Sequence, residues 1–166
     1  MLALGYLGDY ESNAAVGRAL VDRDRGVRLL AETAIRSLWC RIGTENQRQQ
    51  LALIVRLNNS QQHDKAVQRA SRLIDQAPWI AEAWNQRAIG YFSQKRYGQA
   101  IRDCHQTLDI NPYHFGAATG MGYCYLQQKD PVSAMECFRR ALRLNPGLEG
   151  VRAQLVKIQR TLKERD

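Results

Sequence analysis

The sequence predicts an all-α protein, an α-solenoid of stacked helical hairpins, and two repeating features carry that prediction. Three of the four prolines follow one another at intervals of 34 residues: Pro78, Pro112 and Pro146. Alanines recur at the same interval: Ala66, Ala100 and Ala134. A period of this length is typical of solenoids, in which each unit buries its apolar face against the next. The 34-residue spacing of the prolines defines three blocks: 47–80, 81–114 and 115–148.

The first 43 residues have a different rhythm. Apolar residues at helical spacing predict a buried stripe after Asp24, which is suited to cap a helix that begins at Arg25. The stripe comprises Val27, Leu30, Ala31, Ala34, Ile35 and Leu38. The run DRDRGVRLLAETAI resembles the second helix of a HEAT-like repeat, and ALGYLGD at 3–9 resembles the tail of a preceding one. We therefore predict a HEAT-like segment over residues 1–43, joined by a short link to the repeat region 44–166. We expect the segment and the repeat region to pack as one curved solenoid.

Helix signals then follow the blocks in order. Thr44 to Gln47 form a capping box that opens the region 44–166. In the second block we predict helices over 81–94 and 97–108, the latter ended by Asn111-Pro112, since proline disfavours helical geometry in the residue before it. In the third block we predict helices over 117–128 and 132–144, with Pro131 at the opening turn of the second.

A lone amphipathic helix is predicted over 149–164. Its apolar side carries Val151, Leu155, Ile158 and Leu162, and its opposite side is mostly charged. Such a helix can shield the last hairpin from water.

The blocks resemble tetratricopeptide repeats, a 34-residue family with preferred residues at set positions. The third block matches through Gly122, Tyr125, Ala134, Phe138, Ala141 and Pro146. The second matches through Trp84, Tyr91, Ala100 and Pro112, and the first through Ala66 and Pro78 only. The resemblance implies a right-handed α-solenoid of three units closed by a capping helix. It also implies that small residues at recurring positions of the blocks, such as Ala66, Ala100 and Ala134, pack between helices.

No catalytic, metal or cofactor site is expected. The four cysteines show no CxxC spacing, and the three histidines have no ligand spacing with them. We interpret the cysteines as small hydrophobic residues packed between helices. No apolar run approaches the roughly 18 residues of a membrane span, and no signal peptide is evident, so we expect a cytoplasmic protein without a membrane partner.

The resemblance implies a concave groove lined by the first helix of each hairpin, which receives a peptide or helix of a partner. The implied groove residues are Arg48, Leu51, Val55, Asn58, Glu82, Asn85, Ile89, Phe92, Gly116, Thr119, Tyr123 and Leu126, with Lys157 and Arg160 added by the capping helix. The apolar members suggest a binding surface. The alternative is that some of them pack against the N-terminal segment.

Net charge and the residues at the groove positions both indicate what kind of partner the chain binds. The formal net charge of +8 predicts attraction to acidic proteins or to nucleic acid, and we weigh a protein partner above RNA. The family's clamp for the C-terminal carboxylate of chaperones is absent, because its positions carry Leu51, Val55, Gln86, Gly116 and Gly120. We predict a non-enzymatic adaptor or scaffold. A further alternative is that the chain is the interaction part of a larger multidomain enzyme.

Overall fold

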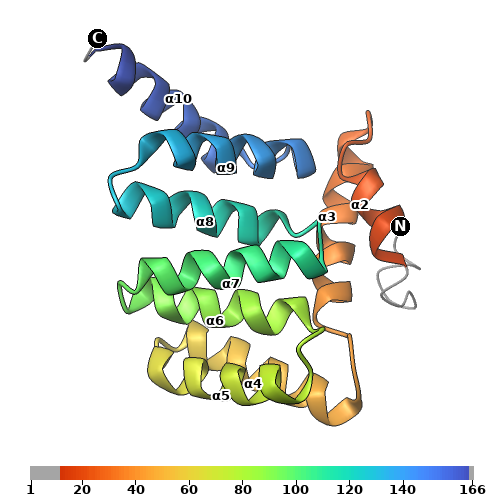
Figure 1. Cartoon of the computed structure of the whole chain (residues 1–166). Coiled ribbons are helices and arrows are strands. Elements are labelled where there is room, and N and C mark those ends of the chain that lie inside the picture. Colours follow the sequence, from red (N-terminus) through yellow and green to blue (C-terminus); the bar gives the residue numbers. More distant parts are fainter. Residues whose placement is uncertain (1–11, 165–166) are drawn as a thin grey trace.

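The computed structural model describes residues 12–164, and these residues form nine helices and no strand (Figure 1). The helices are α2 (Asn13–Ala19), α3 (Arg25–Trp39), α4 (Glu45–Asn59), α5 (His63–Gln76), α6 (Ala81–Ser93), α7 (Tyr97–Ile110), α8 (Phe115–Gln127), α9 (Pro131–Leu144) and α10 (Glu149–Lys163). The all-α solenoid prediction is confirmed. The predicted repeat tail at 3–9 lies outside the described residues.

Local capping chemistry fixes several helix starts as predicted. The Asp24 carboxylate accepts hydrogen bonds from the backbone N–H groups of Gly26 and Val27 at the start of α3. Thr44 and Gln47 form a reciprocal capping box at the start of α4. Pro131 is the first residue of α9, where a missing N–H costs nothing. These groups satisfy backbone donors that the helix itself leaves unpaired.

The turn inside each hairpin uses the same backbone conformation. Gln61, Lys95 and Lys129 have φ values of 59°, 59° and 62°, and they stand 34 residues apart. Left-handed geometry is unfavourable for a residue with a Cβ, by roughly 1–2 kcal/mol. Its recurrence at one register position shows that the three hairpins bend in the same way.

Small residues set the spacing of the stacked hairpins. A Cβ on Gly122 would lie 2.5 Å from the Phe138 ring, so glycine is required for α8 to approach α9. Ala88, Ala100 and Ala134 are buried in the same core cluster, as are three of the cysteines: Cys104, Cys124 and Cys137. The packing interpretation of the small columns and of these thiols is therefore confirmed. Cys40, in contrast, is exposed.

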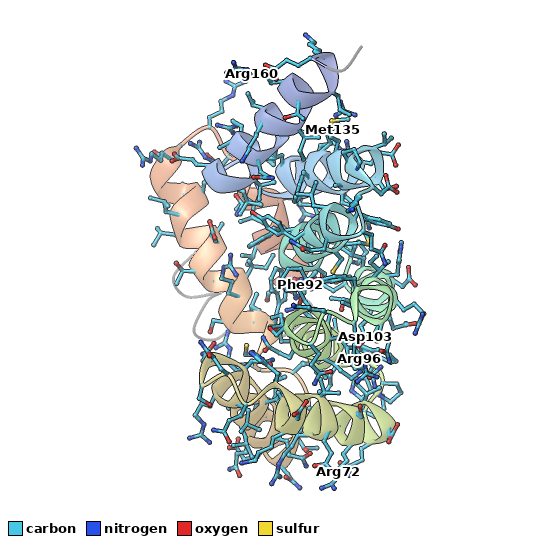
Figure 2. All side chains as sticks on the ribbon, turned by 90° about the vertical axis from the view of Figure 1, so that its left-hand side faces the viewer. Arg72, Phe92, Arg96, Asp103, Met135 and Arg160 are labelled. Atoms are coloured by element: carbon cyan, nitrogen blue, oxygen red, sulfur yellow. The ribbon has the colours of Figure 1, made fainter. Side chains whose placement is uncertain are left out.

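The N-terminal helices cross the stack. Figure 1 shows α3 running upright past the ends of the horizontal helices, and Figure 2 shows it on the side of α6 and α8 that faces away from α7. Val16, Leu20, Ile35 and Leu38 form a small core with Phe115 of α8. The ring of Tyr113 fits against Gly17, where a Cβ would lie 2.5 Å away.

This arrangement differs from the expected further layer of one curved solenoid. The apolar side of α2 and α3 is covered by Tyr113 and Phe115 at the start of α8, and by Leu144 and Leu148 at the end of α9 and in the turn after it, not by a parallel neighbouring hairpin. The HEAT-like character of the segment stays a prediction.

Candidate binding groove

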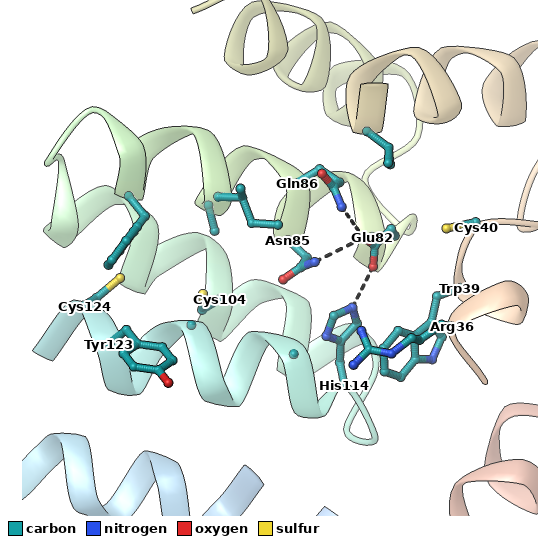
Figure 3. Close-up of a pocket in the computed structure, with 16 residues that line it drawn as sticks. Arg36, Trp39, Cys40, Glu82, Asn85, Gln86, Cys104, His114, Tyr123 and Cys124 are labelled. Atoms are coloured by element: carbon teal, nitrogen blue, oxygen red, sulfur yellow. Dashed lines mark hydrogen bonds and ion pairs between the residues drawn. The ribbon is translucent and has the colours of Figure 1, made fainter. Parts of the chain in front are cut away.

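A cavity of about 380 Å³ lies where the end of α3 meets α4, α6 and α8 (Figure 3). Its wall is largely apolar and includes Val55, Ala88, Ile89, Phe92 and Tyr123. Ile89 and Tyr123 are 41% and 37% exposed, so these side chains can be reached from solvent. Large apolar side chains exposed within a concavity are typical of a binding surface.

One end of the cavity is polar and is centred on the buried carboxylate of Glu82. His114 Nε2 lies 2.7 Å from one carboxylate oxygen. The other oxygen accepts from Gln86 Nε2 at 2.7 Å and from Asn85 Nδ2 at 3.1 Å. Burial raises the pKa of Glu82, but the hydrogen bonds from His114, Gln86 and Asn85 outweigh it and hold that pKa below its usual value. Glu82 is therefore an ionised, fully partnered acceptor at neutral pH.

His114 contacts Glu82 through one ring nitrogen and the start of α8 through the other. Its Nδ1 accepts the backbone N–H of Ala117 at 3.0 Å, so the ring proton resides on Nε2 and is donated to Glu82. The Trp39 ring stacks on the imidazole with centroids 4.0 Å apart. One histidine thus joins α6, α8 and the end of α3.

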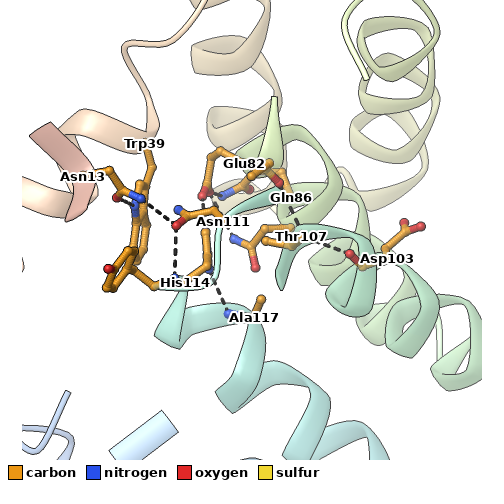
Figure 4. A network of polar contacts seen from close by, with 12 residues as sticks. Asn13, Trp39, Glu82, Gln86, Asp103, Thr107, Asn111, His114 and Ala117 are labelled. Carbon is orange, nitrogen blue, oxygen red and sulfur yellow. Dashed lines mark hydrogen bonds and ion pairs between the residues drawn. The ribbon is translucent and has the colours of Figure 1, made fainter. Parts of the chain in front are cut away.

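A chain of hydrogen bonds continues from Trp39 to α2 (Figure 4). Trp39 Nε1 donates to Asn13 Oδ1 at 2.9 Å, and Asn13 Nδ2 donates to Asn111 Oδ1 at 2.8 Å. All three residues are buried, and these two hydrogen bonds favour one arrangement of their side chains, although Asn111 Nδ2 itself has no hydrogen-bond partner among the described residues. This network positions the α3 side of the cavity.

Two glycines of α8 keep the cavity wide. A Cβ on Gly120 would touch only Cys104 Sγ at 3.7 Å, an ordinary contact, and one on Gly116 would lie 3.3 Å from the His114 ring. Close packing therefore does not demand glycine at 120, although glycine in a helix costs about 1 kcal/mol relative to alanine. Both residues line the cavity, and their missing side chains leave it open.

The rim is basic. Arg36 lies over the Phe115 ring and pairs with Glu32, and both of these charged side chains are partly solvent-exposed. A neighbouring hollow shares Cys40 and Val55 with the cavity and adds Arg56. Among residues 12–164, no acidic side chain pairs with Arg56.

Seven of the predicted groove residues line the cavity, with Gly116 among them; the other six are Val55, Glu82, Asn85, Ile89, Phe92 and Tyr123. Arg36, Trp39 and His114 also line the cavity, although the repeat register does not predict them as groove residues. Trp39 and Arg36 belong to the segment predicted as a separate unit, and the sequence predicts no site role for His114. No sequence spacing links them to α6.

Two groove predictions are wrong in the first block. Leu51 is 1% exposed and belongs to the core with Leu73 of α5, so it is unavailable to a partner. Asn58 is buried, and its amide donates to the backbone oxygen and the side-chain oxygen of Gln86. Its function in the fold is to join α4 to α6.

The other predicted residues lie outside the cavity. Arg48 pairs with Glu45 and also donates to the Gly43 carbonyl. Leu126 packs against the core of the last hairpins, and Thr119 is half-buried on α8. Lys157 and Arg160 are exposed on α10, where Arg160 pairs with Glu164.

Within residues 12–164, no group of three or more His, Cys, Asp or Glu side chains could hold a metal ion. In the same part of the chain, every helix is too short or too polar to cross a membrane.

A family model described as Tetratricopeptide repeat matches residues 81–114 and 117–148, so two of the three predicted repeats are confirmed. WD and tetratricopeptide repeats protein 1 of Homo sapiens is 32% identical over 80 residues, which cover 46% of this chain and 12% of that protein. A TPR repeat-containing protein of Rhizobium etli is 30% identical over 92 residues, covering 50% of this chain and 45% of that protein. The chain thus spans less than half the length of either relative.

Solved structures share the fold. The first TPR of Spaghetti (RPAP3) bound to HSP90 peptide SRMEEVD matches with a TM-score of 0.69 at 20% identity, over 74% of this chain and 97% of that one. The Sgt2 TPR domain from Aspergillus fumigatus matches with a TM-score of 0.68 at 17% identity, over 74% of this chain and 82% of that one. The α4–α5 hairpin, outside the matched family segments, stacks on α6 in the same manner as the later hairpins (Figure 1).

Proposed function

Because this chain contains tetratricopeptide repeats whose first helices surround an apolar cavity, we propose that it is a non-enzymatic adaptor that binds a segment of another protein there. The observation that carries the proposal is the exposure of Ile89 and Tyr123 inside a cavity of about 380 Å³. A cavity of this size suits bulky side chains of a peptide or helix.

The mode of binding differs from carboxylate capture. The neighbouring Spaghetti (RPAP3) structure holds an HSP90 peptide, but the clamp positions in this chain carry no lysine or arginine. Leu51 is core, and Gln86 is engaged by Glu82 and Asn58. We therefore propose recognition by apolar anchoring, with the basic rim at Arg36 and Arg56 favouring acidic flanking residues.

The test replaces both exposed cavity residues in one variant, Ile89→Ser with Tyr123→Ser. Partners captured from a lysate by the full chain are quantified alongside thermal melting. Central apolar contacts often contribute 2 kcal/mol or more, so we expect about thirtyfold weaker capture with a near-normal melting temperature.

A matched control replaces Val132 and Val156 with serine, since both are exposed apolar residues outside the cavity. Capture must survive in this control. A collapse of melting in the cavity variant would instead assign Ile89 and Tyr123 to the core. Equal capture by wild type and cavity variant would refute the groove.

A further inference from the structure

The polar end of the cavity offers a hydrogen-bond acceptor that no residue between 12 and 164 uses, the side-chain oxygen of Asn85. Asn85 is 9% exposed and lines the cavity, and its Nδ2 donates to Glu82. Its Oδ1 accepts no hydrogen bond from any residue between 12 and 164. Figure 3 shows the Asn85 amide with its oxygen turned away from Glu82, toward the interior of the cavity.

The orientation of this amide follows from electrostatics. An oxygen facing the ionised Glu82 carboxylate would be repelled, so the NH₂ group must face Glu82 and the oxygen must face the cavity. The other polar groups are engaged. Gln86 Oε1 accepts from Asn58, and both His114 nitrogens have partners. At this end of the cavity, Asn85 Oδ1 is therefore the side-chain oxygen left without a hydrogen bond among residues 12–164.

We infer that the cavity selects an aromatic side chain with a hydrogen-bond donor at its tip, tryptophan or tyrosine, from the partner polypeptide; this rests on the proposed function. The donor would reach Asn85 Oδ1, and the ring would lie among Ile89, Phe92 and Tyr123. Gly116 and Gly120 carry no side chain, which leaves room beside α8 for a planar group. Aromatic anchors of this kind commonly dominate binding energy.

The same geometry disfavours a carboxylate at this end. An anion would meet Asn85 Oδ1 and the negative charge of Glu82 behind it, and both would repel it. A partner's acidic residues would have to remain at the rim, near Arg36 and Arg56. The ring and its donor tip are therefore what the buried part of the cavity recognises.

The experiment uses two small probes on the full ¹⁵N-labelled chain. N-acetyl-tryptophanamide carries the indole N–H, and its 1-methyl analogue keeps the ring but lacks the donor. Backbone amide shifts of Ile89 and Gly120 report occupancy of the cavity. We expect the methyl analogue to bind roughly three- to tenfold more weakly, the effect of one lost hydrogen bond.

The variant Asn85→Leu removes the acceptor at similar size. It should bind the two probes equally, with melting measured to verify its fold. If wild type binds both probes equally, or if neither probe shifts the cavity signals, the inference is overturned. Neither result contradicts the proposed function. That function is tested separately, by the loss of partner capture when Ile89 and Tyr123 are replaced.

Discussion

The two sides of the cavity are held in place by different physical means. The repeat side, α6 and α8, belongs to a large apolar cluster in which glycine and alanine let helices approach closely. The α3 side has a smaller core and depends on the chain Asn13–Trp39–His114 for its position. Apolar packing is tolerant of gradual change, whereas a buried polar network fails when one partner is lost. The position of the α3 side therefore depends on a few specific contacts, and the loss of one of them should displace it.

The largest effect should come from overfilling the repeat side. Gly122→Val would drive a side chain into the Phe138 ring, and overpacking of a core costs about 1–3 kcal/mol in free energy of unfolding. We expect the upper end of that range, measured by denaturant unfolding. Gly98→Val is the matched control, since a Cβ there meets nothing within 4 Å. Equal losses in both variants would mean that the α8–α9 approach is not limited by Gly122.

A smaller and local effect is expected on the α3 side. Trp39→Phe keeps a ring on His114 but leaves Asn13 Oδ1 without its donor, at a cost of about 1–2 kcal/mol. Amide hydrogen exchange should accelerate in α3 and stay unchanged in α6 and α8. The same substitution at Trp79, which is 53% exposed, should change stability by less than about 0.5 kcal/mol. Uniform acceleration across the chain would contradict two independently held sides.

The smallest effect is a gain. Gly120→Ala adds a methyl group in ordinary contact with Cys104, so helix propensity should raise the free energy of unfolding by up to about 1 kcal/mol. Gly150→Ala on α10 should give a similar gain, because a Cβ there meets nothing within 4 Å. Only the variant at 120 narrows the cavity. A loss of stability at 120 would show that glycine is needed there for packing.

The repeat side could be predicted in some detail from the sequence. Prolines at 34-residue intervals and the columns of small residues placed α6 to α9 within one or two residues of their bounds. Register then identified Asn85, Ile89 and Tyr123 as cavity residues. The same register misplaced Leu51, because a leucine at that position in the weak first block is drawn into the core with α5.

The α3 side could not be predicted because it depends on contacts across the stack. Trp39 meets His114, and Asn13 meets Asn111, at separations that no helical period encodes. The Asn85 acceptor is also a product of three-dimensional arrangement. Its availability requires Glu82 to be ionised and to hold the amide by its NH₂ group.

The matching turns at Gln61, Lys95 and Lys129 have a consequence for how the array can change in length. Since each bend is the same, the hairpins are interchangeable modules, and adding or removing a whole 34-residue module would keep every later bend in phase. Losing a single residue from one turn would rotate all modules beyond it and separate the walls of the cavity. Duplication of complete units is therefore the route by which the array can lengthen with its hairpin bends preserved.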